Sequence, residues 1–151
     1  MTRFRRFALL ALAGLLLASC AAPRTVRPGI EPPAAGMARI YFFRSGALIG
    51  SPSWTAVSLD GRYVGQSAPG TVFHRDVPPG TYEIEVRSAK LYPNQFKTVA
   101  LKPGDILFAE IQQLPTWGQT GRQWVDTTFV VGIVDPAVAA REIATLKPTP
   151  G

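Results

Sequence analysis

The chain has 151 residues, a formal net charge of +6, one cysteine and one histidine. Three of its 16 basic residues, Arg3, Arg5 and Arg6, lie in the first 19 residues, so the remainder carries 13 basic against 10 acidic residues, a net charge of +3. This length suits a single domain with one core, the near balance of charge argues against a nucleic-acid-binding face, and a lone cysteine excludes an internal disulfide.

The first 19 residues have the composition of a secretory signal peptide. The basic start is followed by the apolar run 7–17 and then by the small residues Ala18 and Ser19. A membrane-spanning helix needs about 20 apolar residues, so this run of 11 is too short to span a bilayer. The pattern therefore predicts a cleaved signal peptide over residues 1–19.

The segment Leu17-Ala18-Ser19-Cys20 resembles the bacterial lipobox at every position. The resemblance implies diacylglyceryl attachment to the Cys20 thiol, cleavage before Cys20 and acylation of the new amine. Two or more acyl chains anchor a protein stably to a bilayer, whereas a free thiol in an oxidising compartment is a liability. Because Ala21 follows the cysteine where inner-membrane lipoproteins typically carry Asp, we expect an outer-membrane protein facing the periplasm.

Residues 20–37 form the predicted lipidated N-terminus and tether, since residues 21–37 are rich in proline and glycine and lack an apolar run. In a polyproline-like conformation of ~3.1 Å per residue they would span roughly 50 Å. The alternative for Gly36 and Met37 is that they pack on the edge of the domain.

Short alternating runs separated by Gly/Pro turns then predict an antiparallel β-sandwich of about seven to eight strands over residues 38–134. Asp60-Gly61 between two such runs predicts a hairpin with a type I′ turn. In the run 81–87, Tyr82, Ile84 and Val86 are expected to face the core, while the residues between them face solvent. The expected strands are 38–44, 54–59, 62–64, 71–77, 81–87, 95–101, 106–112 and 124–134.

A C-terminal helix is predicted over residues 135–147, packed on the domain, with 148–151 as a tail. Asp135 suits the N-cap and Pro136 the first helical position. Ala139, Ile143 and Leu146 recur at helical spacing and form one narrow apolar stripe.

Five of these segments resemble a family of small bacterial lipoproteins labelled as a domain of unknown function (twenty-eight forty-six), and the turn pattern is shared with PEGA-like and carboxypeptidase-regulatory-like sandwiches. The resemblance covers about residues 38–146 and implies a compact β-sandwich lipoprotein. It assigns no activity, and the loop around Trp117 has no counterpart in the family pattern. The matching segments are 38–44, 57–65, 77–84, 101–108 and 139–143.

No constellation of catalytic residues is apparent in the sequence. His74 and Asp76 lie two residues apart on an expected strand and so share a face, but no nucleophile motif accompanies them. One histidine and one lipidated cysteine are too few for a zinc site. We therefore predict a protein that is not an enzyme, with no catalytic residue, cofactor or metal.

The loop 114–124 is the candidate binding segment, because it combines Trp117, Arg122 and Trp124 with glycines, and Trp and Arg dominate interaction hot spots. Trp54, near a loop mouth, could join them. The alternative is that Trp124 caps the core and Trp117 folds over the end of the sandwich.

The sequence thus supports two hypotheses of function. The first is a non-enzymatic envelope lipoprotein that is anchored to the lipid bilayer through Cys20 and contacts another envelope protein or assembly. The second is a glycan- or peptidoglycan-binding module that uses the loop 114–124.

Overall fold

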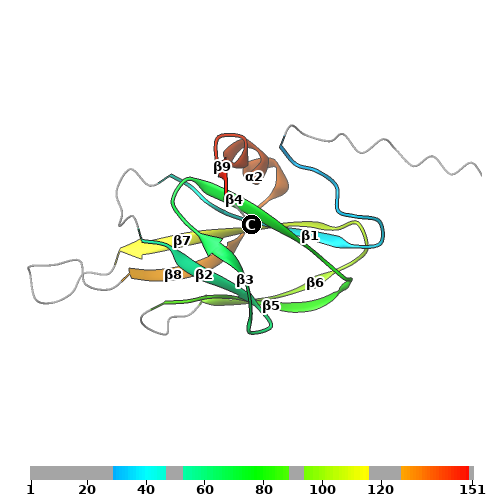
Figure 1. Cartoon of the computed structure of the whole chain (residues 1–151), viewed down its shortest axis with the longest axis horizontal. Coiled ribbons are helices and arrows are strands. Elements are labelled where there is room, and N and C mark those ends of the chain that lie inside the picture. The colour runs from blue at the N-terminus through cyan, green and yellow to red at the C-terminus, as the bar shows by residue number, and fades with distance from the viewer. Residues whose placement is uncertain (1–28, 47–52, 89–93, 116–126, 150–151) are drawn as a thin grey trace, which may run out of the picture.

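The computed structural model describes residues 29–46, 53–88, 94–115 and 127–149, which fold into nine strands and one α-helix (Figure 1). The strands form two sheets: sheet A has the order β8-β7-β1-β4-β9, and sheet B has the order β3-β2-β5-β6. The predicted β-sandwich is confirmed. The elements are β1 Ala38–Arg44, β2 Thr55–Leu59, β3 Arg62–Ser67, β4 Thr71–Val77, β5 Gly80–Val86, β6 Phe96–Leu101, β7 Ile106–Pro115, β8 Thr127–Ile133, α2 Pro136–Ile143 and β9 Lys147–Pro148.

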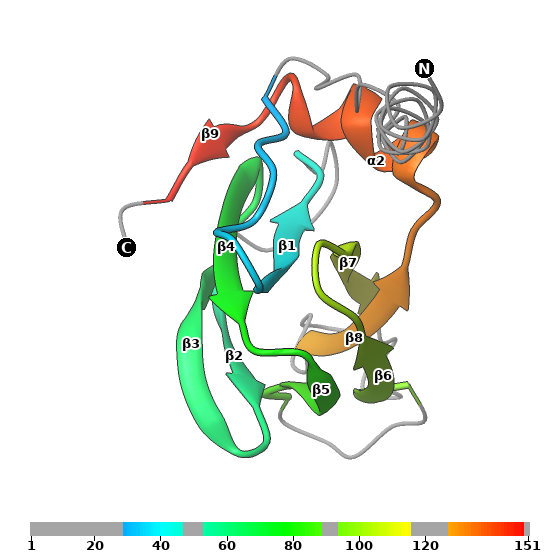
Figure 2. The same ribbon diagram turned by 90° about the vertical axis from the view of Figure 1, so that its right-hand side faces the viewer.

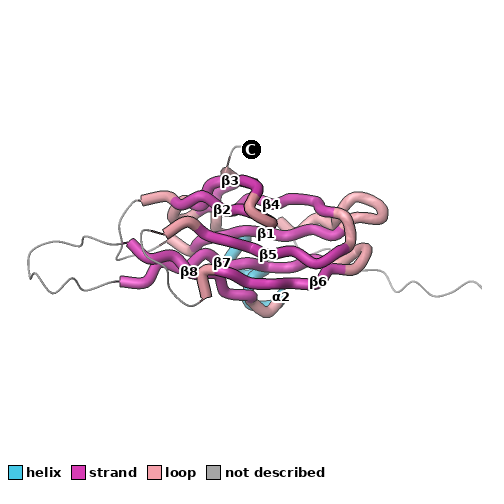
Figure 3. The backbone as a smooth tube through the Cα atoms, turned by 90° about the horizontal axis from the view of Figure 1, so that it is seen from below, coloured by secondary structure: helices cyan, strands magenta, loops and turns pink. Residues whose placement is uncertain are grey.

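The chain crosses repeatedly between the two layers, which Figure 3 shows from below. β1 is followed by the β2–β3 hairpin of sheet B, then by β4 in sheet A, β5–β6 in sheet B and β7–β8 in sheet A. The expectation of purely antiparallel pairing was wrong for sheet A, because β1 pairs parallel with β7 and β4 pairs parallel with β9. Only strands joined by a tight turn are obliged to run antiparallel, and neither of these pairs is.

The turn between β2 and β3 has the predicted geometry. Asp60 and Gly61 have φ values of 49° and 73°, and a type I′ turn requires positive φ at both central positions. Asp60 also accepts a hydrogen bond at Oδ1 from the backbone N–H of Glu83 (2.8 Å). The turn is therefore attached to the neighbouring strand β5.

The main core lies between the two sheets. Alternate residues of β5 enter it as predicted, with Ile84 and Val86 buried and Tyr82 packed against them. At the edge strand β3, a Cβ on Gly65 would lie 2.5 Å from the Phe73 ring, so only glycine fits there. The other members come from both sheets: Ala38, Ile40, Phe42, Val57, Leu59, Phe73, Val77, Leu101, Ala109, Ile111, Phe129 and Val131.

A second apolar cluster lies on the outer face of sheet A, which we call the covered face. Helix α2 and residue Ile30 pack there against Tyr41, Phe43 and Phe108. In Figure 2 the first described residues, in blue, run beside α2, and the strands of sheet B lie on the opposite side of the molecule. The outer face of sheet B carries no such layer within the described residues, and we call it the open face.

Helix α2 begins as predicted and ends earlier. Asp135 is the N-cap, its Oδ1 accepts from the N–H of Ala137 (2.7 Å), and Pro136 opens the helix. The helix ends at Ile143, four residues short of the predicted end. Beyond it the N–H of Lys147 donates to the carbonyl of Gly70 (3.0 Å), next to the free edge of β4. Pairing with this edge forms the short strand β9.

Candidate functional site

Residues 29–37, which we call the N-terminal strap, pack on the covered face. The sequence predicted that they form part of the tether. Ile30 is buried with the α2 cluster. The N–H of Glu31 donates to the Tyr41 hydroxyl (2.9 Å), and the N–H of Ala34 donates to Asp76 Oδ2 (3.1 Å). Residues 30–37 therefore pack on the folded domain, and only nine residues separate Ile30 from Cys20.

The strap is held by an ion pair that the pairing of β1 with β4 creates. Their register sets Arg39 opposite Asp76. The guanidinium donates through Nε to Asp76 Oδ1 (2.6 Å) and through Nη2 to Oδ2 (3.0 Å). Its Nη1 donates to the carbonyl of Glu31 (3.3 Å), which belongs to the strap. This bidentate geometry is the strong form of a charge-assisted hydrogen bond.

The two partners stabilise each other's charge. The hydrogen bonds from Arg39 lower the pKa of Asp76 to about 2, and the N–H of Ala34 contributes in the same direction. The hydrogen bond with Asp76 in turn raises the pKa of Arg39. Since Arg39 is only 7% exposed, losing Asp76 would leave a nearly buried charge with only a longer ion pair to the exposed Glu31 carboxylate (3.7 Å).

An aromatic row crosses the covered face beside this ion pair. The Tyr41 ring lies between those of His74 and Phe108, with both centroid distances 5.4 Å. His74 is exposed, but its partial desolvation lowers its pKa, and the nearby Arg39 charge acts in the same direction. His74 and Asp76 share this face as expected, but both Asp76 oxygens accept from Arg39 and Oδ2 also accepts from Ala34. The carboxylate therefore holds the strap.

A second polar centre lies at the end of the sandwich where β1 and β7 end and β2 and β8 begin. Arg44 is 3% exposed there. It donates to the carbonyl of Ser53 (2.8 Å) and to Gln113 Oε1, and its guanidinium lies over the Phe129 ring, 5.0 Å from the centroid. Burial lowers the pKa of Arg44. Arg44 thus fixes the backbone directly before Trp54, whose side chain is 60% exposed.

The residues singled out from the sequence fall largely outside the described ranges. Cys20 does, and so do the three residues of the candidate binding loop, Trp117, Arg122 and Trp124. Only the two ends of that loop are described: Leu114 of β7 is paired with Thr128 of β8. Sequence reasoning missed Arg39, Tyr41 and Arg44. The one signal for them is that the apolar run 40–43 lacks alternation, as in strands covered on both faces.

Other kinds of site find no support within the described residues. No group of three or more His, Cys, Asp or Glu side chains gathers there in a way that could hold a metal ion. The described part of the chain also has no helix with the length and apolarity needed to cross a bilayer.

Comparison with known proteins assigns no family. No protein-family model matches the chain, and a search of the curated proteins gives no match either. The lipoprotein family resemblance therefore stays a prediction, and the functional argument depends on the chain's own residues.

Proposed function

We propose that this protein is a lipid-anchored, non-enzymatic component of a bacterial cell envelope, held on the outer membrane through acyl chains on Cys20 and facing the periplasm. In this position it contacts another envelope protein or assembly. The residue-level support is the signal peptide followed by the lipobox cysteine. The structural support is the strap, since only nine residues separate its buried Ile30 from Cys20.

The position of the strap limits the orientation of such a domain relative to the membrane. A chain of nine residues reaches at most about 30 Å, even fully extended. That is close to the diameter of a domain of about 110 residues, whose radius of gyration is ~13 Å. The strap leaves the domain on the covered face, beside α2 (Figure 2). The proposal therefore implies that the covered face is turned toward the lipid and the open face away from it.

The proposal that the protein is not an enzyme is supported by the structural role of the charged side chains that lie close together. Asp76 and Arg39 form the ion pair that fastens the strap. Arg44 braces the backbone at Ser53. These groups are engaged in holding segments of the chain, which is a structural role.

Metabolic labelling with radioactive palmitate tests the anchoring. The wild-type protein should incorporate label and sediment with membranes, whereas Cys20→Ala should incorporate none and lose the membrane association. A Ser19→Ala variant is the matched control, because alanine also fits the lipobox. Absence of label from wild type, or equal label in Cys20→Ala, would refute the proposal.

The second candidate function is a glycan-binding module that uses the loop 114–124. The observation that favours it is the exposed Trp54, whose preceding residue is fixed by Arg44 at the same end of the sandwich. Purified cell-wall sacculi should then retain the protein, and Trp117→Ala should reduce the retention. Equal retention of both proteins would remove the loop from consideration.

A further inference from the structure

One row of side chains crosses the whole open face. The strand register sets Tyr63 opposite Ser58, Ser58 opposite Glu85, and Glu85 opposite Phe96. The residues on either side of Ser58 and Glu85 in their own strands are buried in the main core. Since side chains alternate between the two faces of a strand, the members of this row point outward.

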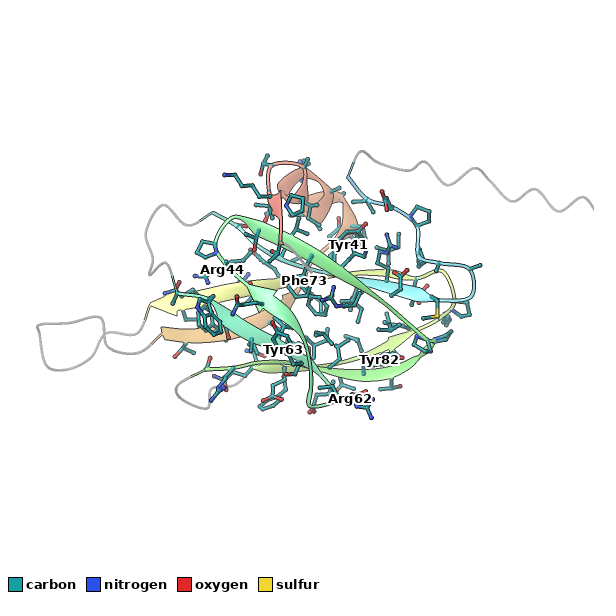
Figure 4. All side chains as sticks on the ribbon, viewed as in Figure 1. Tyr41, Arg44, Arg62, Tyr63, Phe73 and Tyr82 are labelled. Carbon is teal, nitrogen blue, oxygen red and sulfur yellow. The ribbon has the colours of Figure 1, made fainter. Side chains whose placement is uncertain are left out.

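Aromatic rings stand at both ends of the row. Tyr63 is 66% exposed and Phe96 is 43% exposed. They lie on the outer strands of a four-stranded sheet, and three steps of ~4.8 Å between strands separate their backbones by about 14 Å. Figure 4 places Tyr63 in the half of the molecule formed by sheet B, away from Tyr41 and α2. Exposed rings held at a fixed spacing form a platform for stacking.

The centre of the row is polar, which narrows the class of ligand. Within the described residues the carboxylates of Glu85 and of its neighbour Glu83 make no ion pair and accept no hydrogen bond. An apolar protein surface placed over them would bury unpaired charge, which is costly. A sugar strand avoids that cost, because its hydroxyls donate to a carboxylate and to Ser58 while the C–H faces of its rings pack against aromatic rings.

We propose that the row Tyr63–Ser58–Glu85–Phe96 binds a neutral oligosaccharide strand that lies across the strands of sheet B. The free carboxylates repel a polyanionic glycan and so select a neutral one. The proposal rests on the glycan class of the second candidate function but places the binding site on sheet B instead of the loop 114–124, and it does not need the lipid anchor. The open face lies opposite the strap, so anchoring through Cys20 leaves it accessible.

Calorimetric titration with N-acetylchitohexaose and with cellohexaose tests the site, using the full-length expressed chain purified from whichever cell fraction holds it. Wild type should bind at least one of these neutral probes. Tyr63→Ala and Phe96→Ala should each weaken binding about tenfold, the effect of losing one aromatic contact. Glu85→Gln should weaken binding several-fold, and Tyr63→Phe should leave it nearly unchanged because the ring remains.

Two controls separate this site from its competitors. Ile133→Ala removes an apolar side chain of similar exposure (44%) from β8 of sheet A and should leave the affinity unchanged. Trp117→Ala should also leave it unchanged, whereas a loss confined to Trp117→Ala would assign the glycan to the loop and overturn the proposal. No binding of either probe by wild type, or equal affinity of wild type, Tyr63→Ala and Phe96→Ala, would overturn it as well. Palmitate labelling is unaffected by any of these outcomes, so failure here and failure of the anchoring proposal are distinguishable.

Discussion

The two outer faces of this sandwich differ in whether other parts of the chain cover their aromatic residues. The covered face buries Tyr41, Phe43 and Phe108 beneath segments of the same chain, namely the strap and α2. The open face leaves Tyr63 and Phe96 in solvent. The chain therefore builds a second core on the side where the strap lies and leaves aromatic rings exposed on the other side. Aromatic residues serve stability on the covered face and, in our proposal, glycan recognition on the open face.

The largest contrast is expected from one substitution made on each face. Phe43→Ala removes a 1% exposed side chain from the covered face and should lower the free energy of unfolding by about 3–5 kcal/mol. Phe96→Ala, on the open face, should cost less than about 1 kcal/mol because its ring already contacts water. Urea unfolding of the two variants measures both values. Similar losses would mean that the faces do not differ as described.

The next effect concerns the ion pair beneath the strap. Asp76→Asn leaves the Arg39 guanidinium with only its longer ion pair to Glu31 (3.7 Å) and should cost about 3 kcal/mol. It should also speed hydrogen exchange at the Ala34 amide, which donates to Asp76. Glu83→Gln on the open face is the matched control, and its effect on stability should stay within about 0.5 kcal/mol. An equal loss in the free energy of unfolding for the two variants would contradict a stabilising role of the Arg39–Asp76 pair.

The same pair predicts a pH dependence of stability. The pKa of Asp76 in the folded protein is about 2, below its ordinary value of 3.8. A depressed carboxyl pKa contributes stability above the unfolded pKa, here about 2 kcal/mol, and this is lost as the pH falls from about 4 toward 2. Urea unfolding at pH 7 and at pH 2.5 should show the wild type losing most of this amount relative to Asp76→Asn. A constant difference between the two proteins would argue against it.

The smallest effect is the titration of His74, the only histidine in the chain. Partial desolvation beside Tyr41 lowers its pKa from 6.5 although the side chain is exposed, so an NMR titration should give a midpoint below 6.5. The sign follows from linkage: stability from the neutral ring is present above 6.5 and is lost as the pH falls through the lower, folded value. A midpoint at or above 6.5 would indicate that the strap side of the molecule is more open to solvent.

Local patterns predicted much of this fold. Asp60-Gly61 specified its turn through the positive φ that both positions need, and Asp135-Pro136 specified the start of α2. The alternation from Tyr82 to Val86 identified the inner face of β5. In each case the information lies within a few consecutive residues.

The features that the sequence did not reveal depend on distant pairs. Arg39 and Asp76 lie 37 residues apart, and only the β1–β4 register makes them partners. The parallel pairing of β1 with β7 and the end of α2 at Ile143 likewise depend on hydrogen bonds with strands that are distant in the sequence. The strap is rich in Pro and Gly, a composition that predicts a tether. The buried Ile30 and hydrogen bonds of the backbone groups of Glu31, Ala34 and Met37 dock it.

The central claim is that the covered face lies toward the membrane and the open face away from it. We would attach a fluorophore to Ala137→Cys, at an exposed position of α2, or to Thr98→Cys, on β6 of the open face. The lipidated protein would then be reconstituted into liposomes that contain lipids with a quencher on the headgroup. Acylation consumes the Cys20 thiol, so each variant carries one label. Quenching should be several-fold stronger at position 137 than at position 98. Equal quenching at the two positions, or stronger quenching at position 98, would contradict the account.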